Sequence, residues 1–445
     1  MKRELGIFER GQFIADRYAP FHIVGVLRLE GAPLPHILQR SLTELQKRHP
    51  LLSARLMEEK TRLYFTTLSE PTLPFRTLSR SNDEHWIQVV ESELGNRIDT
   101  PAGPMFRCTY LYNESQQRAE IILAISHSIA DAASVSHLLH EFLTICASVA
   151  DGKPVSASEL PPAPPLESRF PSAFLGWRLS LRIVRYALTQ IADEVSYRMK
   201  TIGKRTPPLH KRASHGHILP VQFPSDLVEP FAQRARMEGV TLNSGLNAAL
   251  LLAVNRHLYK GAKLPMRTFS FADLRSYVDP PLHAENLGLY ISMIRYTVQM
   301  DDSSGFWSLA RDLHKKIYKS LKSGDKFVAA TTVESLMKLV TGFKAYRMGS
   351  TALNYSGVIP VQTDYGKIKV NAVHGFVSPY AFGPEMASQA QIFNDTLFWD
   401  FAYLEEDMDQ KKAKMIVEEA RRIMESVIAS GAKQSPTVQE NASSQ

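Results

Sequence analysis

The clearest hydrophobic pattern in the chain is a continuous apolar run that passes into a helically spaced one. Residues 121–125 read IILAI, and a run this short and rich in β-branched residues predicts a strand buried on both faces. Beyond it, apolar side chains recur at helical spacing, at Val135, Leu138, Leu139, Phe142, Cys146 and Val149. The polar stretch between them, SHSIADAAS at residues 126–134, is therefore expected to form the loop between a buried strand and an amphipathic helix.

Similar alternation continues along both halves of the chain. In the first half it predicts strands at residues 21–29, 51–57, 62–67 and 105–112, and helices at 34–48 and 83–98. In the second half it predicts strands at 216–223, 266–271, 289–299, 352–355, 368–373, 389–393 and 397–404, and helices at 225–237, 242–259, 303–321, 328–340 and 408–428. We therefore predict an α/β (α+β) fold in which each half forms a mixed sheet flanked by helices.

The segment between the two halves has a different character. Six prolines between residues 151 and 171 disfavour a helix there. Residues 172–200 then predict a long amphipathic helix, with an apolar seam at Trp177, Leu181, Val184, Leu188, Ile191 and Val195. We expect an N-terminal domain at residues 1–165, a linker with this helix at 166–212, a C-terminal domain at 213–430 and a disordered tail at 431–445.

Composition sets limits on the class of protein. A chain of 445 residues, 44 % of them hydrophobic, is long enough for two cores. The N-terminus lacks the apolar stretch of a signal peptide, and no run of 18 apolar residues predicts a membrane span. Cys108 and Cys146 fall inside a predicted strand and helix without metal-ligand neighbours, so we expect buried thiols, no metal site and a cytoplasmic location.

The net charge of +7 is concentrated in one region. Between Arg169 and Arg212 there are ten Lys or Arg and two acids, a balance of +8, so the rest of the chain is close to neutral at −1. Local basicity of this kind argues against general nucleic-acid binding. Three arginines, Arg178, Arg182 and Arg185, lie on a stripe beside the apolar seam and are candidates for docking an anionic partner. The partner would be a carrier protein, the phosphates of a nucleotide or an anionic membrane; the alternative is a solvated face on a helix whose seam packs against the protein.

The loop at residues 126–134 carries the candidate chemistry. His127 could accept a proton near neutral pH, and Asp131, four positions later, could cap the following helix or order the loop. Chance alone would give about one His-x-x-x-Asp in a chain with 14 histidines, so the spacing by itself also fits an ordinary polar loop.

With its flanks, this loop resembles the His-His-x-x-x-Asp-Gly signature of the condensation-domain and chloramphenicol-acetyltransferase-like superfamily. Four further stretches resemble superfamily segments in the expected order: LQKRHPLLSARL at 45–56, GPMFRCTYLY at 103–112, VTLNSGLNAALLLAVNRHL at 240–258, and FADLRS with ENLGLY within 271–290. Ser126 replaces the first His and Ala132 replaces the Gly. The Asp-Phe-Gly-Trp-Gly motif of the plant enzymes is absent, since residues 400–404 read DFAYL. In style the chain is most similar to the free-standing polyketide-associated acyltransferases.

The resemblance implies two such domains arranged in a V, with the active-site tunnel between them. It implies that His127 acts as the general base, that Asp131 pairs with Arg275 to order the loop, and that Ser126, Ala132 and Asn354 lie at the tunnel. The expected reaction moves an acyl group from a thioester, carried by coenzyme A or an acyl carrier protein, to a hydroxyl or amine acceptor in natural-product or lipid biosynthesis.

Several further expectations follow from the resemblance. No cofactor is bound, the thioester serves as co-substrate, and we expect a monomer with peripheral membrane contact as one option. Three alternatives remain open: an amide-forming condensation enzyme like those of peptide synthetases, a member that only binds a carrier or acyl chain, and a hydrolase in which His127 activates water.

Overall fold

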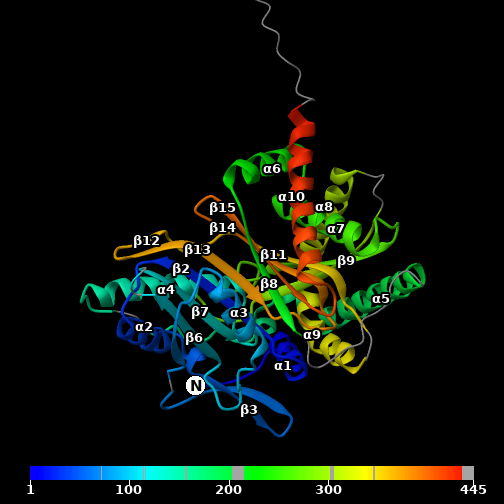
Figure 1. Ribbon diagram of the computed structural model, residues 1–445. Helices are drawn as coiled ribbons and strands as arrows, with labels where there is room; N and C mark the ends of the chain where they lie inside the picture. Colours follow the sequence, from blue (N-terminus) through cyan, green and yellow to red (C-terminus); the bar gives the residue numbers. More distant parts are fainter. Residues whose placement is uncertain are drawn as a thin grey trace, which may run out of the picture.

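The structure is a computed structural model, which describes residues 1–432 apart from 72, 114, 116, 156–157, 203–214, 301–304 and 344–345. Two six-stranded sheets, each flanked by helices, form its framework (Figure 1). The predicted α/β class is therefore confirmed. The predicted tail at 431–445 lies almost wholly outside the described residues.

The first sheet has the strand order β12-β13-β2-β7-β6-β5. Its strands are β12 (Asp364–Tyr365), β13 (Ile368–Val377), β2 (His22–Glu30), β7 (Arg118–Ser126), β6 (Phe106–Asn113) and β5 (Phe75–Ser79). All neighbours are antiparallel except β5 and β6. Strand β13 comes from the second half of the chain, so this sheet is completed by a strand that follows the middle strands by more than 200 residues in sequence.

Helices cover both faces of the first sheet. α2 (Pro35–Arg48) and α4 (Ala132–Ala150) pack together on one face, and α3 (His85–Gly95) covers the other. Gly25 on β2 lets α4 approach closely, because a Cβ atom there would lie 2.6 Å from a methyl carbon of Val135. The site loop at residues 126–134 therefore lies between the central strand β7 and a tightly packed helix.

The second sheet has the order β10-β9-β11-β14-β15-β8. Its strands are β10 (Ile291–Gln299), β9 (Pro265–Asp273), β11 (Gly349–Val358), β14 (Pro384–Phe393), β15 (Thr396–Leu404) and β8 (Gly216–Phe223). The helices α6 (Ser225–Met237), α7 (Leu242–Tyr259), α8 (Phe306–Ser323) and α10 (Gln410–Ala432) contribute to a core on one face. The other face meets α1 (Ile7–Tyr18) and α9 (Asp325–Gly342), so its side chains lie toward the centre of the molecule.

The remaining elements are smaller or peripheral. A three-stranded sheet combines β1 (Lys2–Glu4), β4 (Arg62–Thr67) and β3 (Ala54–Glu59). Short 3-10 turns, η1 (Pro50–Ser53), η2 (Leu166–Arg169) and η3 (Ser172–Phe174), interrupt the loops, and α5 (Gly176–Thr201) lies at the edge of the molecule (Figure 1). The predicted domain boundaries stay a prediction, because β13 and α1 both cross between the two halves of the chain.

Among the described residues, only α4 has the length and hydropathy to cross a membrane by itself, and α6 with α7 would count only as a span bent by 105°. Half of the α4 window is buried inside the protein, as expected for the core helix of a sheet layer.

Candidate functional site

His127 lies directly after strand β7, at the point where the chain turns toward α4. Its side chain is only 8 % exposed, and its Nδ1 atom lies 2.8 Å from the carbonyl oxygen of Ala130. A carbonyl oxygen can only accept, so Nδ1 carries the hydrogen. In the neutral ring Nε2 is then left with a free lone pair, which is the form that a general base needs.

Burial also keeps this ring neutral. It lowers the pKa of His127 below its ordinary value, although the Ala130 carbonyl and the nearby Asp131 charge act in the opposite sense. The ring of Phe21 lies against His127 with 5.0 Å between ring centroids. His127 is thus held in one tautomer within an apolar environment and can accept a proton at neutral pH.

Asp131 begins helix α4 and is completely buried. Its Oδ1 accepts from the backbone N–H of Ser134 at 2.9 Å, so Asp131 caps the helix, which is one of the two roles expected from the sequence. It also accepts two hydrogen bonds from Arg275, each at 3.0 Å, and one from the backbone N–H of Tyr290 at 2.9 Å. The ion pair expected between Asp131 and Arg275 is present, and Asp131 performs both tasks.

The surroundings of this pair satisfy nearly all of its polar atoms. Arg275 also donates to Asp273 at 3.1 Å, to the Ser134 hydroxyl at 2.8 Å and to the Asn286 carbonyl at 3.2 Å. Burial alone would raise the pKa of Asp131, but the Arg275 charge and the hydrogen bonds lower it overall. Asp131 therefore remains ionised and bound to Arg275, and its described hydrogen bonds are not made to His127.

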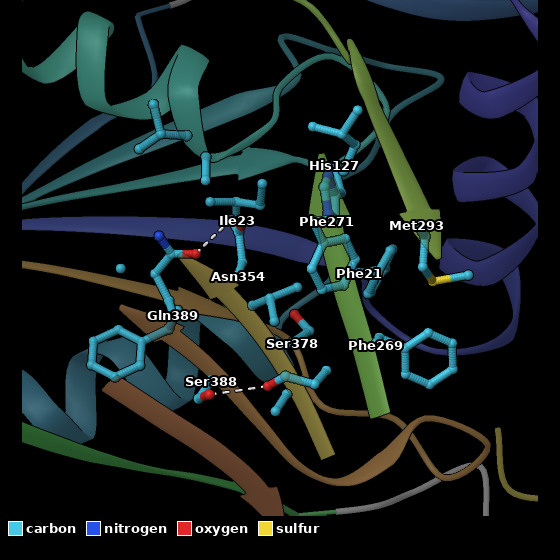
Figure 2. A pocket seen from close by; sticks show the side chains of 18 of the residues that line it. Phe21, Ile23, His127, Phe269, Phe271, Met293, Asn354, Ser378, Ser388 and Gln389 are labelled. Atoms are coloured by element: carbon cyan, nitrogen blue, oxygen red, sulfur yellow. Dashed lines mark hydrogen bonds between the residues drawn. The ribbon is translucent and has the colours of Figure 1, made fainter. Parts of the chain in front are cut away.

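A large apolar cavity begins at His127. It holds about 1240 Å³ of empty space, the open solvent at its mouth included. Apolar side chains from both halves of the chain line it, among them Phe21, Ile23, Phe269, Phe271 and Met293 (Figure 2). Val135, Leu139, Val333, Met337 and Met348 also line it. Polar groups are fewer, and a cavity of this kind suits an organic molecule with a substantial apolar part.

The cavity contains two of the three predicted tunnel residues. Ala132 lies in the wall beside His127, and Asn354 reaches it from strand β11. The Asn354 side-chain amide donates to the Oε1 atom of Gln389 at 2.7 Å (Figure 2). Gln389 in turn donates to Ser356 at 2.8 Å. Asn354 lies within strand β11, and Gln389 holds its side chain at the cavity.

Ser126 is not among the residues that line the cavity. Successive side chains on a strand point to opposite faces, so the residue before His127 points elsewhere. Its hydroxyl is buried and accepts from the backbone N–H of Ser128 at 3.4 Å. The structure therefore gives Ser126 a local role in the loop and does not place it in the tunnel wall.

Other functional positions were not identified from the sequence. Phe21, Ser378, Tyr380 and Gln389 line the cavity, and Ser134, Gly288 and Tyr290 surround the ion pair. Several of these contacts use backbone atoms, which carry no residue-type signal, and the others come from strands distant in sequence. The pattern ENLGLY was the one signal that pointed to Gly288 and Tyr290.

The arginine candidates lie away from the cavity, on helix α5. Arg178, Arg182 and Arg185 are exposed, as expected. The seam beside them is exposed as well, so the alternative in which it packs against the protein is wrong. Polar and aromatic residues on the other side of α5 fasten the helix instead. Among the residues that the structure describes, no group of three or more His, Cys, Asp or Glu could hold a metal ion.

Comparisons with known proteins agree with this architecture. Residues 222–394 match the family described as phthiocerol/phthiodiolone dimycocerosyl transferase C-terminus. The trichothecene 15-O-acetyltransferase of Fusarium sporotrichioides superposes with a TM-score of 0.77 at 11 % identity, covering 96 % of this chain and 95 % of that one. Polyketide synthase associated protein 5 from Mycobacterium tuberculosis gives 0.70 at 14 % identity, covering 96 % and 98 %.

A third solved structure decides the fold. The first condensation domain of the CDA synthetase gives a TM-score of 0.68 at 12 % identity, with 96 % of each chain covered. The protein has the condensation-domain fold. The predicted resemblance to the condensation-domain and chloramphenicol-acetyltransferase-like superfamily is thereby confirmed at the level of the fold. In this condensation-domain fold the two sheets form the two lobes, and the cavity at His127 receives residues from both. The search of curated protein sequences gives no match.

Proposed function

We propose that the protein is an acyltransferase that moves an acyl group from a thioester to a hydroxyl or amine, with His127 as the general base. The observation that carries the proposal is the bond between His127 Nδ1 and the Ala130 carbonyl at 2.8 Å. It fixes the tautomer whose Nε2 can accept a proton, at the wall of a large apolar cavity.

The proposed transfer needs one proton carrier and no covalent enzyme intermediate. The acceptor O–H or N–H gives its proton to His127 Nε2 as its oxygen or nitrogen attacks the thioester carbonyl carbon. The tetrahedral intermediate then collapses, the carbon–sulfur bond breaks, and the thiolate takes the proton back from His127. During this cycle the Ala130 carbonyl and the nearby Asp131 charge favour the protonated imidazole, while burial opposes it.

Asp131 and Arg275 act as positioning residues in this proposal. They join the start of α4 to the chain that follows β9, and they hold the loop that carries His127. Such a buried pair fixes geometry more reliably than it adds net stability. A misplaced His127 would lose the short approach to the acceptor that proton transfer requires.

The comparisons support the reaction class. The matching family is named as a transferase, and among the structural relatives one is named as an acetyltransferase and another as a condensation domain. We extend this to an acyl-coenzyme A or acyl carrier protein donor, a small alcohol or amine acceptor, and a place in natural-product or lipid biosynthesis. The apolar lining of the cavity favours a donor or acceptor with a long hydrocarbon part.

Location is the remaining part of the proposal. Cys108 and Cys146 are buried free thiols, as a reducing compartment would leave them. Burial raises the pKa of the Cys146 thiol to about 12, so it is unreactive at neutral pH. We therefore propose a cytoplasmic enzyme.

The test follows thiol release from a panel of acyl thioesters, with and without alcohols and amines. Both cysteines are buried and should not disturb a thiol reagent. We expect release only when an acceptor is present, together with a matching acylated product detected by mass spectrometry. Release without acceptor would instead identify a hydrolase, and thioester binding without release would identify a binding protein. The panel's alcohols and amines separate ester from amide formation.

A further inference from the structure

Helix α5 exposes an apolar stripe that the rest of the protein leaves uncovered. Each of its eight members is more than half exposed, from 53 % for Val195 to 77 % for Ile202. The stripe consists of Trp177, Leu181, Val184, Leu188, Ile191, Val195, Met199 and Ile202. Within the helix it extends for about 33 Å, from Trp177 to Met199. Scattered apolar side chains on a surface are ordinary, but a continuous row of this length is not.

The opposite face of α5 fastens the helix to the protein. Tyr186 packs into a small core with Tyr296, and Tyr197 is buried beneath the guanidinium of Arg267, 3.7 Å from the ring centroid. Arg267 also donates to Asp193 at 2.9 Å and to Glu194 at 2.7 Å. At 3.6 residues per turn Tyr186, Asp193 and Tyr197 lie on the far side of the helix from the stripe, and Glu194 lies on one flank. The orientation of α5 is therefore fixed, and the stripe must point away from the body.

The charges around the stripe that have no oppositely charged partner among the described residues are all positive. Arg178, Arg182 and Arg185 are exposed along one flank, and Arg198 and Lys200 are exposed near the end of the helix. The two acids of α5, Asp193 and Glu194, are both engaged by Arg267, and Glu194 also pairs with the exposed Arg198 at 2.7 Å. Arg178 has one described contact, with the ring of the adjacent Trp177, and Arg185 has none among the described residues. The outward surface of α5 thus combines apolar side chains with cations, and the acids of the helix are already paired with arginines.

We propose that α5 lies in the interface of an anionic lipid membrane, with its stripe among the acyl chains and its arginines at the headgroups. An amphipathic helix with cations beside its apolar face binds such surfaces both by burying apolar area and by electrostatic attraction to anionic lipids. A second copy of the helix would bury the stripe equally well, but it would bring cations against cations, because both acids of α5 are already paired with arginines. Charge complementarity therefore favours the lipid surface.

The proposal gives the membrane a specific place relative to the cavity. Arg267 on β9 and Arg295 on β10 hold α5. Phe269 and Met293 lie two positions away from these arginines on the same faces of the two strands, and both line the cavity. Two strand residues span about 7 Å. Helix α9, which packs beside α5, contributes Val333 and Met337 to the same cavity. A membrane bound at α5 would lie next to the cavity, close enough to supply an apolar substrate of the transfer proposed above.

The test is flotation of the full chain with lipid vesicles, and it needs no acyltransferase assay. The vesicles contain phosphatidylcholine alone or mixed with phosphatidylglycerol. We compare wild type with Leu181→Gln/Leu188→Gln/Ile191→Gln, which alters the stripe, and with Arg178→Gln/Arg185→Gln, which alters charge without breaking a described contact to the body. The matched control is Met237→Gln/Val358→Gln, which replaces two equally exposed apolar residues outside α5.

We expect wild type and the control to float with the mixed vesicles at low salt, and the stripe variant to remain unbound with an unchanged melting temperature. The arginine variant should bind the mixed vesicles roughly 30-fold more weakly, about fivefold for each arginine, and high salt should reproduce this loss. The proposal is overturned if wild type does not float at low salt, or if the stripe variant floats as well as the control. It is also overturned if wild type ignores vesicles and forms a dimer that the stripe variant converts to monomer.

Discussion

Asp131 and Arg275 form a two-pronged ion pair, with both carboxylate oxygens 3.0 Å from guanidinium nitrogens, although 144 residues separate them in the chain. Neither group supplies the bond that orients His127, which comes from the carbonyl of Ala130. The pair fixes the end of the loop where α4 begins, and the loop backbone fixes the histidine. This separates the residue that would carry a proton from the residues that place it.

Replacing one partner of this pair should reduce stability more than replacing both. Asp131→Ala leaves the Arg275 charge buried and should lower the free energy of unfolding by roughly 3–5 kcal/mol, with a loss of acyl transfer. The double variant Asp131→Ala/Arg275→Met removes that isolated charge and should recover part of the melting temperature but little activity. Equal melting temperatures for wild type and Asp131→Ala would contradict a stabilising pair.

Replacing the proposed base should abolish transfer without unfolding the protein. His127→Ala is expected to lower turnover by about 10²- to 10⁴-fold, the usual range for a lost general base. Its melting temperature should stay within a few degrees of wild type, because the described side-chain hydrogen bond of His127 is a local one to Ala130. A purified variant that retains more than about half of wild-type turnover would disprove the mechanism.

The pH profile of transfer should have its acid limb shifted downward. The pKa of His127 is lowered by burial, so the neutral ring persists at pH values where an exposed histidine is already protonated. We expect kcat/KM to stay constant as the pH falls through about 6.5 and to decline only below it. A decline that begins above that value would show that a different group, or an exposed histidine, limits the reaction.

A second buried histidine should make stability depend on pH. Burial and the nearby Arg107 charge lower the pKa of His22 to about 3, while the unfolded chain protonates it near its ordinary value. Between these values the unfolded state binds more protons, so stability is lost as the pH falls. At pH 5 the loss is about 2 kcal/mol.

Urea unfolding at neutral and mildly acidic pH measures this contribution. His22→Gln can still donate to the Asn96 carbonyl, which His22 Nε2 meets at 3.2 Å, and cannot take up a proton. The difference between wild type and His22→Gln should therefore shrink or reverse as the pH is lowered. Parallel pH profiles for the two proteins would rule out His22 as the source.

Asn354 tests whether the polar side of the cavity recognises the acceptor. Asn354→Ala removes the hydrogen-bond donor to Gln389 and leaves the side-chain oxygen of Gln389 without this partner in the cavity. We expect the KM for the acceptor to rise several-fold while the KM for the thioester stays the same. Thr351→Val, on the same strand but outside the cavity lining, where its hydroxyl donates to Thr268, is the matched control and should leave both values unchanged. Unchanged acceptor KM in Asn354→Ala would limit Asn354 to a role in strand pairing.

Regular hydrophobic spacing predicted much of the fold. The bounds of α6, α7 and β8 agree with the predicted ranges because each has an unbroken pattern that ends at a turn. Helix α1 was missed because three polar residues, Glu9, Gln12 and Asp16, lie on its buried face. Burial of such residues depends on partners elsewhere, such as Arg97, which bonds to Asp16.

The site was predictable in part, because some of its residues also lie in local sequence patterns. His127 and Asp131 stand in one local motif, and the resemblance supplied Arg275 from a distant one. The seam of α5 shows the limit of reasoning from pattern, since apolar spacing reveals a stripe but not the direction it faces. That direction is set by Arg267 and Arg295, whose contacts with Asp193, Glu194 and Gln190 join segments that no local pattern relates.

The position of β13 in the first sheet has a consequence for how the chain folds as it is synthesised. Until residues 368–377 leave the ribosome, β2 has no neighbour on one side and exposes an almost entirely buried strand as an open edge. Early folding of the N-terminal part is thus delayed until most of the chain is available, and long-range pairing of this kind is slow. Fragments that end before β13 should aggregate on expression, whereas the complete chain closes the edge with its own strand.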